Sequence, residues 1–157
     1  MGRVVAPDLS WSKAVPGEAT EIAAFLWAAW NAADHDAPAY AALSDEWVAA
    51  TASIDALQVR VEDPAKSIVV VRAGSAMVGV AALTTIPPGT AEITEILVHP
   101  MACRSGVGAE ALTGCIRVAR QLGAGRIRAH ARDERGRTFF LHHRFQPVEG
   151  PYLERAI

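Results

Sequence analysis

The spacing of apolar residues changes along the chain between a period of two and a period near 3.6, which separates expected strands from expected helices. Alternation and β-branched runs predict extended segments at 11–15, 67–72, 77–84, 90–98, 126–131 and 145–154. Spacings of three and four residues predict helices at 16–29, 44–61 and 134–143, and a further one that ends near Leu122. This order indicates an α+β layer sandwich without repeats, low-complexity tracts or linkers.

Length and charge bound the class of protein. The chain has 157 residues, of which 51% are hydrophobic, enough for one domain with a sizeable core and not comfortably for two. We therefore expect a single domain over residues 1–157, with residues 1–9 flexible. The formal net charge of −2 gives no basic excess, so neither nucleic acid nor an anionic membrane is expected as the main partner.

Cysteines, histidines and the first residues point to an ordinary cytoplasmic protein. No segment has the length of a membrane span, and residues 1–8 lack the apolar core of a secretory signal. Two cysteines, Cys103 and Cys115, do not make a disulfide framework. Five scattered histidines show no paired metal-ligand spacing, so no metal is expected.

The stretch from Ala91 to Leu112 reads as a strand, a tight loop and the first turns of a helix. Gly106 and Gly108 lack a Cβ, so the backbone between Arg104 and the helix can close and aim several N–H groups at one anion. The helix dipole also favours negative charge at this position. The stretch therefore predicts a site for a pyrophosphate.

Three motifs in this order resemble the GCN5-related N-acetyltransferase (GNAT) superfamily. The loop 103–108 is similar to the acyl-CoA loop of that family, which begins with Gln or Arg and contains two spaced glycines. The preceding 98–100 segment and the downstream 138–145 segment, which is similar to FYxxxGF, lie at the customary distances. The resemblance covers roughly residues 67–148. It implies a three-layer α/β/α sandwich whose central, mostly antiparallel mixed sheet is splayed at the acyl-CoA site.

The resemblance also implies acetyl-CoA as the acyl donor and assigns its contacts. Pantetheine would pair with the backbone of the strand before the loop, the pyrophosphate would lie on the loop, and the downstream helix would complete the site. The residues so assigned are Ile96, Leu97, Val98, Cys103, Arg104, Ser105, Gly106, Val107, Gly108, Ala109, Asp133, Phe139 and Phe140. One or two arginines of the run 126–137 would meet the 3′-phosphate, unless that run is a solvated face.

Acyl transfer to an amine needs a base that removes a proton from the ammonium. Glu92 is the first choice, because the resemblance places it where the histone acetyltransferase branch has its glutamate. Glu95 is the rival, and strict alternation would put the two on opposite faces of the strand. The alternative for either is a solvated carboxylate, with ordered waters moving the proton instead.

The proton donor to the departing thiolate is where the sequence departs from the family. Phe140 stands where FYxxxGF has its tyrosine, Cys103 replaces Gln or Arg, and Arg144 replaces a glycine. Tyr40 and Tyr152 remain as other possible acids. A thiolate of pKa near 8.5 can also leave unaided, so the loss of the tyrosine is expected to slow the reaction rather than abolish it.

The acceptor is expected over the first two helices. Trp27, Trp30, Asp34, Asp36 and Tyr40 would form an aromatic and acidic patch suited to an organic cation such as a primary amine. The alternative is that the two tryptophans belong to the core and that the acidic residues solvate a loop.

Three classes of function therefore stay open. The leading one is a cytoplasmic N-acetyltransferase that moves acetyl from acetyl-CoA to a small-molecule or peptide amine in a ternary complex. The second is a non-catalytic regulatory domain that binds acyl-CoA, and the third is a toxin-like aminoacyl-tRNA acetyltransferase. A homodimer is left open.

Overall fold

The computed structural model describes residues 8–32, 40–42, 53–102, 105–131 and 133–157, with the backbone alone for residues 30–32 and 40–42. Its elements in chain order are β1 (Leu9–Lys13), the 3-10 turn η1 (Pro16–Glu18), α1 (Ala19–Ala32), β2 (Tyr40–Ala42), α3 (Ile54–Glu62), β3 (Lys66–Ala73), β4 (Ala76–Ile86), β5 (Thr90–Val98), the 3-10 turn η2 (Pro100–Ala102), α4 (Val107–Gln121), β6 (Arg126–His130), α5 (Glu134–His142), β7 (Gln146–Pro147) and β8 (Tyr152–Ala156).

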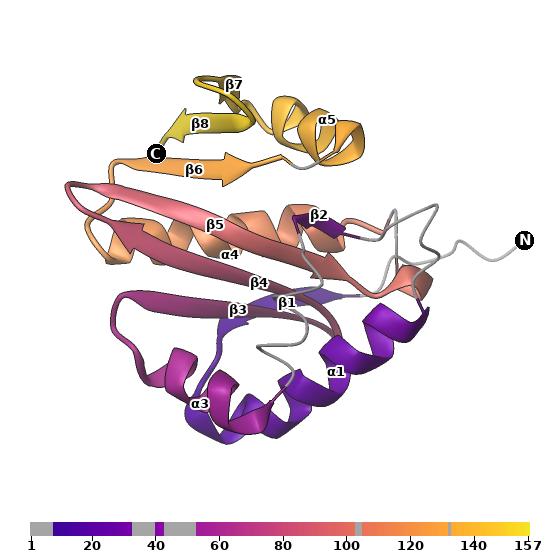
Figure 1. Ribbon diagram of the computed structural model, residues 1–157. Coiled ribbons are helices and arrows are strands. Elements are labelled where there is room, and N and C mark those ends of the chain that lie inside the picture. Colours follow the sequence, from indigo (N-terminus) through magenta and orange to yellow (C-terminus); the bar gives the residue numbers. More distant parts are fainter. Residues whose placement is uncertain (1–7, 33–39, 43–52, 103–104, 132) are drawn as a thin grey trace, which may run out of the picture.

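The strands form one mixed sheet in the order β1-β3-β4-β5-β6-β8-β7, with β2 added to β5 off this path (Figure 1). Only β5 and β6 run parallel, and every other described pair is antiparallel. This agrees with the mostly antiparallel mixed sheet that the family resemblance implies. The parallel pair is joined through α4, as a parallel connection requires.

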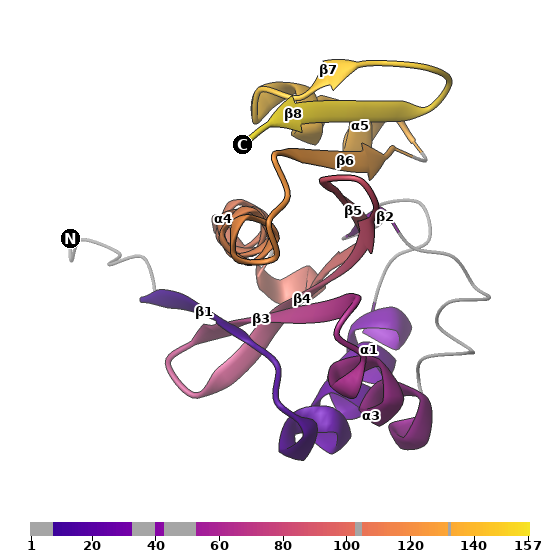
Figure 2. The same ribbon diagram turned by 90° about the vertical axis from the view of Figure 1, so that its left-hand side faces the viewer.

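Helices cover both faces of the sheet and bury two separate cores (Figure 2). Residues of α1 and α3 pack on one face, against β3, β4 and Leu97 of β5. Residues of α4 and α5 pack on the other face, together with residues of β5, β6 and β8. We call these the α1/α3 core and the α4 core. The three-layer arrangement is the predicted one.

Helix α4 forms because its sequence has a continuous apolar stripe and glycine signals at both ends. Leu112, Cys115 and Ala119 recur at helical spacing and are all buried. The chain leaves the helix at Gly123, whose φ of 84° is the left-handed value that glycine adopts without strain. Gly114 lets the helix approach the sheet closely, since a Cβ there would lie 2.7 Å from Cγ1 of Val69.

The second helix begins later than the sequence pattern suggests. The expected range was 44–61, but α3 begins at Ile54 and Ser53 is its N-cap. The backbone of Ser53 is extended, and its hydroxyl accepts a hydrogen bond from the Ala56 N–H at 3.1 Å. A helix cannot run through a residue that caps it, so the predicted continuous helix is wrong at this point. Residues 43–52 lie outside the described part of the chain.

Candidate functional site

Strand β5 changes its neighbour halfway along its length. Its first part pairs in parallel with β6, and this ladder ends where Ile93 lies opposite Ala129. Beyond this point Ile96 and Leu97 pair with the short strand β2 instead. Figure 1 shows β5 and β6 diverging toward this end, with β2 between them. The sheet is therefore splayed where β5 leads into the glycine loop.

A β-bulge interrupts β5 directly after the ladder to β6 ends. Ile93 and Glu95 lie opposite consecutive residues of β4, so Thr94 is an extra residue in this pairing. One extra residue shifts the alternation of the following side chains by one position. Ile93 before the bulge and Ile96 after it accordingly lie in the same α4 core, although three positions separate them.

The bulge puts Glu92 and Glu95 on the same face of the sheet, and the prediction of opposite faces is wrong. Glu92 directly precedes Ile93, and Glu95 directly precedes Ile96, and both isoleucines point into the α4 core. Because neighbouring residues in a strand point to opposite faces, both carboxylates lie on the face away from α4. The two candidate bases therefore share one surface.

Glu92 lies beside a cation. Its register partner on β6 is Arg128, and the Arg128 Nε is 3.8 Å from the Glu92 Oε1. The guanidinium carbon of Arg128 lies 3.5 Å from the centroid of the Tyr152 ring, and the His130 ring centroid is 5.1 Å from that of Tyr152. Carboxylate, guanidinium, phenol and imidazole thus form a row across β5, β6 and β8. We call these four residues the Arg128 row.

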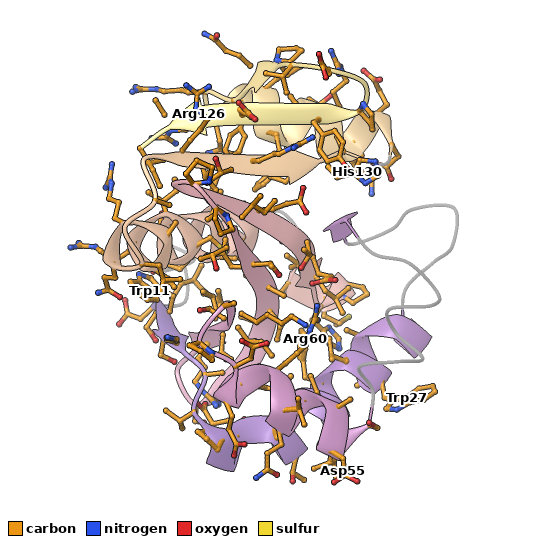
Figure 3. The ribbon with its side chains drawn as sticks, turned by 60° about the vertical axis from the view of Figure 1, so that its left-hand side comes forward. Trp11, Trp27, Asp55, Arg60, Arg126 and His130 are labelled. Atoms are coloured by element: carbon orange, nitrogen blue, oxygen red, sulfur yellow. The ribbon has the colours of Figure 1, made fainter. Side chains whose placement is uncertain are left out.

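Glu95 is the more deeply buried of the two carboxylates, with 5% of the residue exposed. Its Oε2 lies 3.6 Å from Nη1 of Arg60 and accepts a hydrogen bond from the Thr94 hydroxyl. Arg60 reaches toward β5 from the last turn of α3 (Figure 3). The sequence analysis missed Arg60, although it is the sole cation of the segment 54–62 and so stood out from its neighbours.

The loop after β5 presents a helix N-terminus without a side-chain cap. Gly106 is the N-cap of α4, with φ 87° and ψ 6°, and as a glycine it has no side chain that could cap the helix. The Ser105 hydroxyl donates to the Ala102 carbonyl, which holds the loop against η2. The first helical N–H groups, from Val107 to Ala109, therefore have no capping side chain, which is the arrangement that binds anions. Cys103 and Arg104 lie outside the described residues.

Side chains and backbone of the loop and of β5 have different roles. Val107 and Ile96 are buried in the α4 core, and Leu97 is buried in the α1/α3 core on the other face of the sheet. Their side chains are structural, and only their backbone is available for contacts with a ligand. Val98 is partly buried and packs against the α4 core. Gly108 brings α4 against α5, because a Cβ there would lie 3.1 Å from Cε2 of Phe139.

Helix α5 uses two of its predicted cofactor residues for its own folding. The Asp133 carboxylate caps the helix by accepting a hydrogen bond from the Gly136 N–H at 2.7 Å. Phe140 is fully buried, with ring centroids 5.2 Å from Phe139 and 5.1 Å from Phe145. The ring of Phe140 is therefore part of the core, and the predicted contact of Phe140 with a cofactor stays a prediction. Phe139 is only partly buried and lies beside the start of α4.

The arginines of β6 face away from the loop. Ile127 and Ala129 point into the α4 core, so Arg126 and Arg128 point to the opposite face. Arg126 pairs with Glu154 on β8, at 3.1 Å from its Nη1 to Oε2. The expectation that one or two arginines of the run 126–137 meet the 3′-phosphate therefore finds no support at Arg126 and Arg128, which face away from α4. Arg132 lies outside the described residues.

A basic groove that the sequence analysis did not identify runs along α4. It has a volume of about 290 Å³ and is lined by Ala109, Leu112, Thr113, Ile116, Arg117, Arg120, His143 and Arg155. Burial lowers the pKa of His143, and nearby His142 and Arg155 lower it further. The spacing of Arg117 and Arg120 by three residues on one helix face was the sequence signal for this groove. We call it the α4 groove.

The predicted acceptor patch is only partly within the described residues. Trp27 lies on α1, is 49% exposed and projects from the helix (Figure 3). The side chains of Trp30 and Tyr40 are not described, although both residues have an assigned backbone, and Asp34 and Asp36 lie outside the described residues. Their proposed contacts with an amine stay predictions.

Two further kinds of site were sought in the described part of the chain. No group of three or more His, Cys, Asp and Glu residues there is arranged to hold a metal ion. None of its helices is long and apolar enough to cross a membrane.

Comparison with known proteins gives one family and one fold. The sequence model of the acetyltransferase (GNAT) family matches residues 19–145. No curated protein matches the chain significantly.

Among solved structures, the PaiA N-acetyltransferase of Thermoplasma acidophilum in complex with coenzyme A has a TM-score of 0.74 at 15% identity, over 96% of this chain and 99% of that one. The N-acetylglutamate synthase of Neisseria gonorrhoeae, complexed with coenzyme A and N-acetyl-glutamate, has a TM-score of 0.69 at 21% identity, over 95% of this chain and 35% of that one. YncA of Salmonella typhimurium, with acetyl-CoA, has a TM-score of 0.67 at 17% identity, over 94% of this chain and 93% of that one. At these identities the likeness shows the fold.

Proposed function

The chain belongs to the GNAT family of acetyltransferases, and we propose that it transfers an acetyl group from acetyl-CoA to a primary amine by direct attack in a ternary complex. One observation carries this proposal. At one end of β5, a splayed strand edge lies next to a helix N-terminus that has no side-chain cap. A strand edge can pair with the amides of pantetheine, and a helix N-terminus binds phosphate. These two surfaces suit the two chemically different parts of coenzyme A.

The anionic end of the donor would extend from the helix N-terminus into the α4 groove. Ala109 belongs to both, because it lies in the first turn of α4 and also lines the groove. The pyrophosphate would accept hydrogen bonds from the first N–H groups of α4. The 3′-phosphate would then meet Arg117, Arg120 or Arg155, in place of the arginines of the run 126–137 that were first expected there.

The pantetheine arm would compete with β2 for one edge of β5. Strand β2 pairs with Ile96 and Leu97, and these are the residues whose backbone the arm is expected to use. Because one strand edge cannot hydrogen-bond two partners at once, donor binding requires β2 to leave this edge. Hydrogen exchange tests this step: with acetyl-CoA, amides of residues 40–42 should exchange faster while those of Ile96 and Leu97 stay protected. Unchanged exchange at 40–42 would contradict the proposed path of the arm.

Glu92 or Glu95 would take the proton in the chemical step. The amine nitrogen forms a bond to the thioester carbonyl carbon, the C–S bond breaks, and the electron pair leaves on the thiolate. The proton lost by the amine passes to the carboxylate. Both glutamates lie on the same face, away from the pyrophosphate helix, so the acceptor would approach from the side opposite α4. The buried ring of Phe140 offers the thiolate no proton. The thiolate would therefore leave unprotonated, which its low basicity permits.

The first test is a calorimetric titration with acetyl-CoA, followed by an amine screen for free thiol. The wild type is compared with Gly108→Trp, whose side chain has no room beside Phe139. The matched control is Gly125→Trp, because no atom lies within 4 Å of a Cβ built there. Binding by the wild type and the control but not by Gly108→Trp supports the site. Equal binding by all three would overturn the placement of the pyrophosphate.

Two observations favour a second candidate, a regulatory domain that binds acyl-CoA without turnover. Phe140 supplies no general acid, and β2 lies on the β5 edge that the donor would use. The two candidates differ in one measurement. Thiol release that depends on an amine and falls by about 10²–10⁴-fold in Glu92→Gln or Glu95→Gln indicates catalysis. Tight binding with no thiol release above background, for any amine, indicates the regulatory domain.

A further inference from the structure

Arg128 is held in place while one of its buried donors stays unpaired. Its guanidinium carbon lies over the Tyr152 ring, 3.5 Å from the ring centroid, and the face of an aromatic ring attracts a cation. Its contact with Glu92, at 3.8 Å, is longer than a hydrogen bond. Within the described residues, the buried Nε of Arg128 has no hydrogen-bond partner. An unpaired buried donor of this kind costs stability unless a ligand uses it.

Arg128 also leans toward the splayed end of the sheet. Its own register partner on β8 is Glu154, but its guanidinium lies over Tyr152, which is the partner of His130 two residues farther along β6. The side chain therefore points along β6 toward the end where this strand parts from β5. Figure 3 shows Arg126 and His130 at the two ends of β6, with His130 at the splayed end.

We propose that the acceptor is a zwitterionic amine of the α-amino acid class, whose carboxylate is bound by Arg128 and whose ammonium is received by Glu92. The inference rests on the proposed acetyl transfer and names the acceptor for that same site. A carboxylate matches the planar fork of an arginine, which a held guanidinium presents without further ordering. A carboxylate and a guanidinium 3.8 Å apart match the opposite charges of an α-amino acid, whose ammonium and carboxylate groups are bonded to the same carbon.

The same arrangement disfavours simple amines. A ligand with only an ammonium would pair with Glu92 and leave Arg128 without a partner for its unpaired donor. Its positive charge would also lie close to the guanidinium, which is unfavourable at short range. A zwitterion brings no net charge and satisfies both partners. The acceptor carboxylate is therefore expected to be recognised and not merely tolerated.

The test compares each of a panel of L-amino acids with its amide and with its decarboxylated amine, at saturating acetyl-CoA. We expect kcat/KM at least tenfold higher for the amino acid, since the amide and the amine lack the charged group that Arg128 binds. In Arg128→Gln, KM for the amino acid should rise about 10- to 100-fold, while KM for acetyl-CoA stays unchanged. Arg128→Lys keeps the charge but not the planar fork, so its KM for the amino acid should lie between those of the wild type and Arg128→Gln.

Arg126→Gln is the matched control. Arg126 lies two residues earlier on the same strand and face, farther from the splayed end, carries the same charge and pairs with Glu154. Its KM values should stay within about twofold of the wild type, the size of a surface charge effect. If Arg128→Gln fails to fold, as judged by its melting curve, the KM in Arg128→Lys decides. A preference for the decarboxylated amines, or equal KM values in the Arg128 and Arg126 variants, overturns the inference. If no amine at all is acetylated, both this inference and the proposed acetyl transfer are overturned.

Discussion

Gly106 begins α4 in a conformation that other residues adopt only with strain, and Gly106→Ala tests whether this conformation serves an anion site. The φ of Gly106 is 87°, and the nearest atom to a Cβ built there is Cδ1 of Leu9 at 3.8 Å. The substitution therefore adds no clash, and its cost is the backbone strain alone. An L-residue in the left-handed region costs about 1–2 kcal/mol. For a domain of this length we expect a melting temperature lower by roughly 2–8 °C.

Gly123→Ala is a matched control at the other end of the same helix. Gly123 has φ 84°, and no atom lies within 4 Å of its added Cβ, so it should lose about the same stability. Acetyl-CoA affinity, measured by calorimetry, separates the two variants. If Gly106→Ala relieves its strain by turning the first N–H groups of α4, about 1.4 kcal/mol of lost binding would raise Kd roughly tenfold. Gly123→Ala should bind as the wild type does. Equal affinities for both variants, with equal losses of stability, would refute an anion site at Gly106.

The other predictions concern charge and strain away from the loop. Arg144 has φ 69°, so Arg144→Gly should raise the free energy of unfolding by about 1 kcal/mol, measured by urea denaturation; an unchanged midpoint would contradict the strain. Burial raises the pKa of Cys115 to about 12, so iodoacetamide at pH 8 should leave the peptide that contains it unmodified until urea is added. Arg72 donates hydrogen bonds that lower the pKa of Glu21, and this stabilisation is present above pH 4.5 and lost as the pH falls through the lowered pKa. Arg72→Met should therefore cost up to about 1 kcal/mol at pH 7, with the difference from the wild type shrinking toward pH 3; a constant difference would contradict it.

The periodicity of apolar residues predicted the layers because burial of a stripe decides where helices and strands form. Leu112, Cys115 and Ala119 are all buried as their spacing requires. The same reasoning failed at Ser53, because a pattern of apolar positions does not distinguish one helix from two segments separated by a cap. Gly106 adopts the left-handed conformation that its residue type permits, whereas Gly108 lies in the first turn of α4.

The site side chains were harder to predict, because their partners come from elements that are distant in sequence. Arg60 is in contact with Glu95 through the docking of α3 on the sheet, which no local pattern specifies. The burial of Phe140 and the capping role of Asp133 depend on how α5 packs. For the α4 groove, the spacing of two arginines was visible, but the other walls come from His143, which follows α5, and from Arg155 of β8.

The bulge left a signal in the sequence that strict alternation overlooks. It also explains why the two faces of β5 are chemically different. Apolar residues advance by two positions to Ile93 and then by three to Ile96, which is the signature of one extra residue. In an unbroken strand Glu95 would point with Ile93 into the α4 core, where an unpaired carboxylate is costly. The insertion of Thr94 instead turns Glu95 toward Arg60 and keeps Ile96 in the core. Because the ladder to β6 ends at the residue before the bulge, one discontinuity both parts the strands and gathers the carboxylates on the face opposite α4. In the proposed acetyl transfer, donor and acceptor would therefore reach the same strand from different sides without competing for one surface.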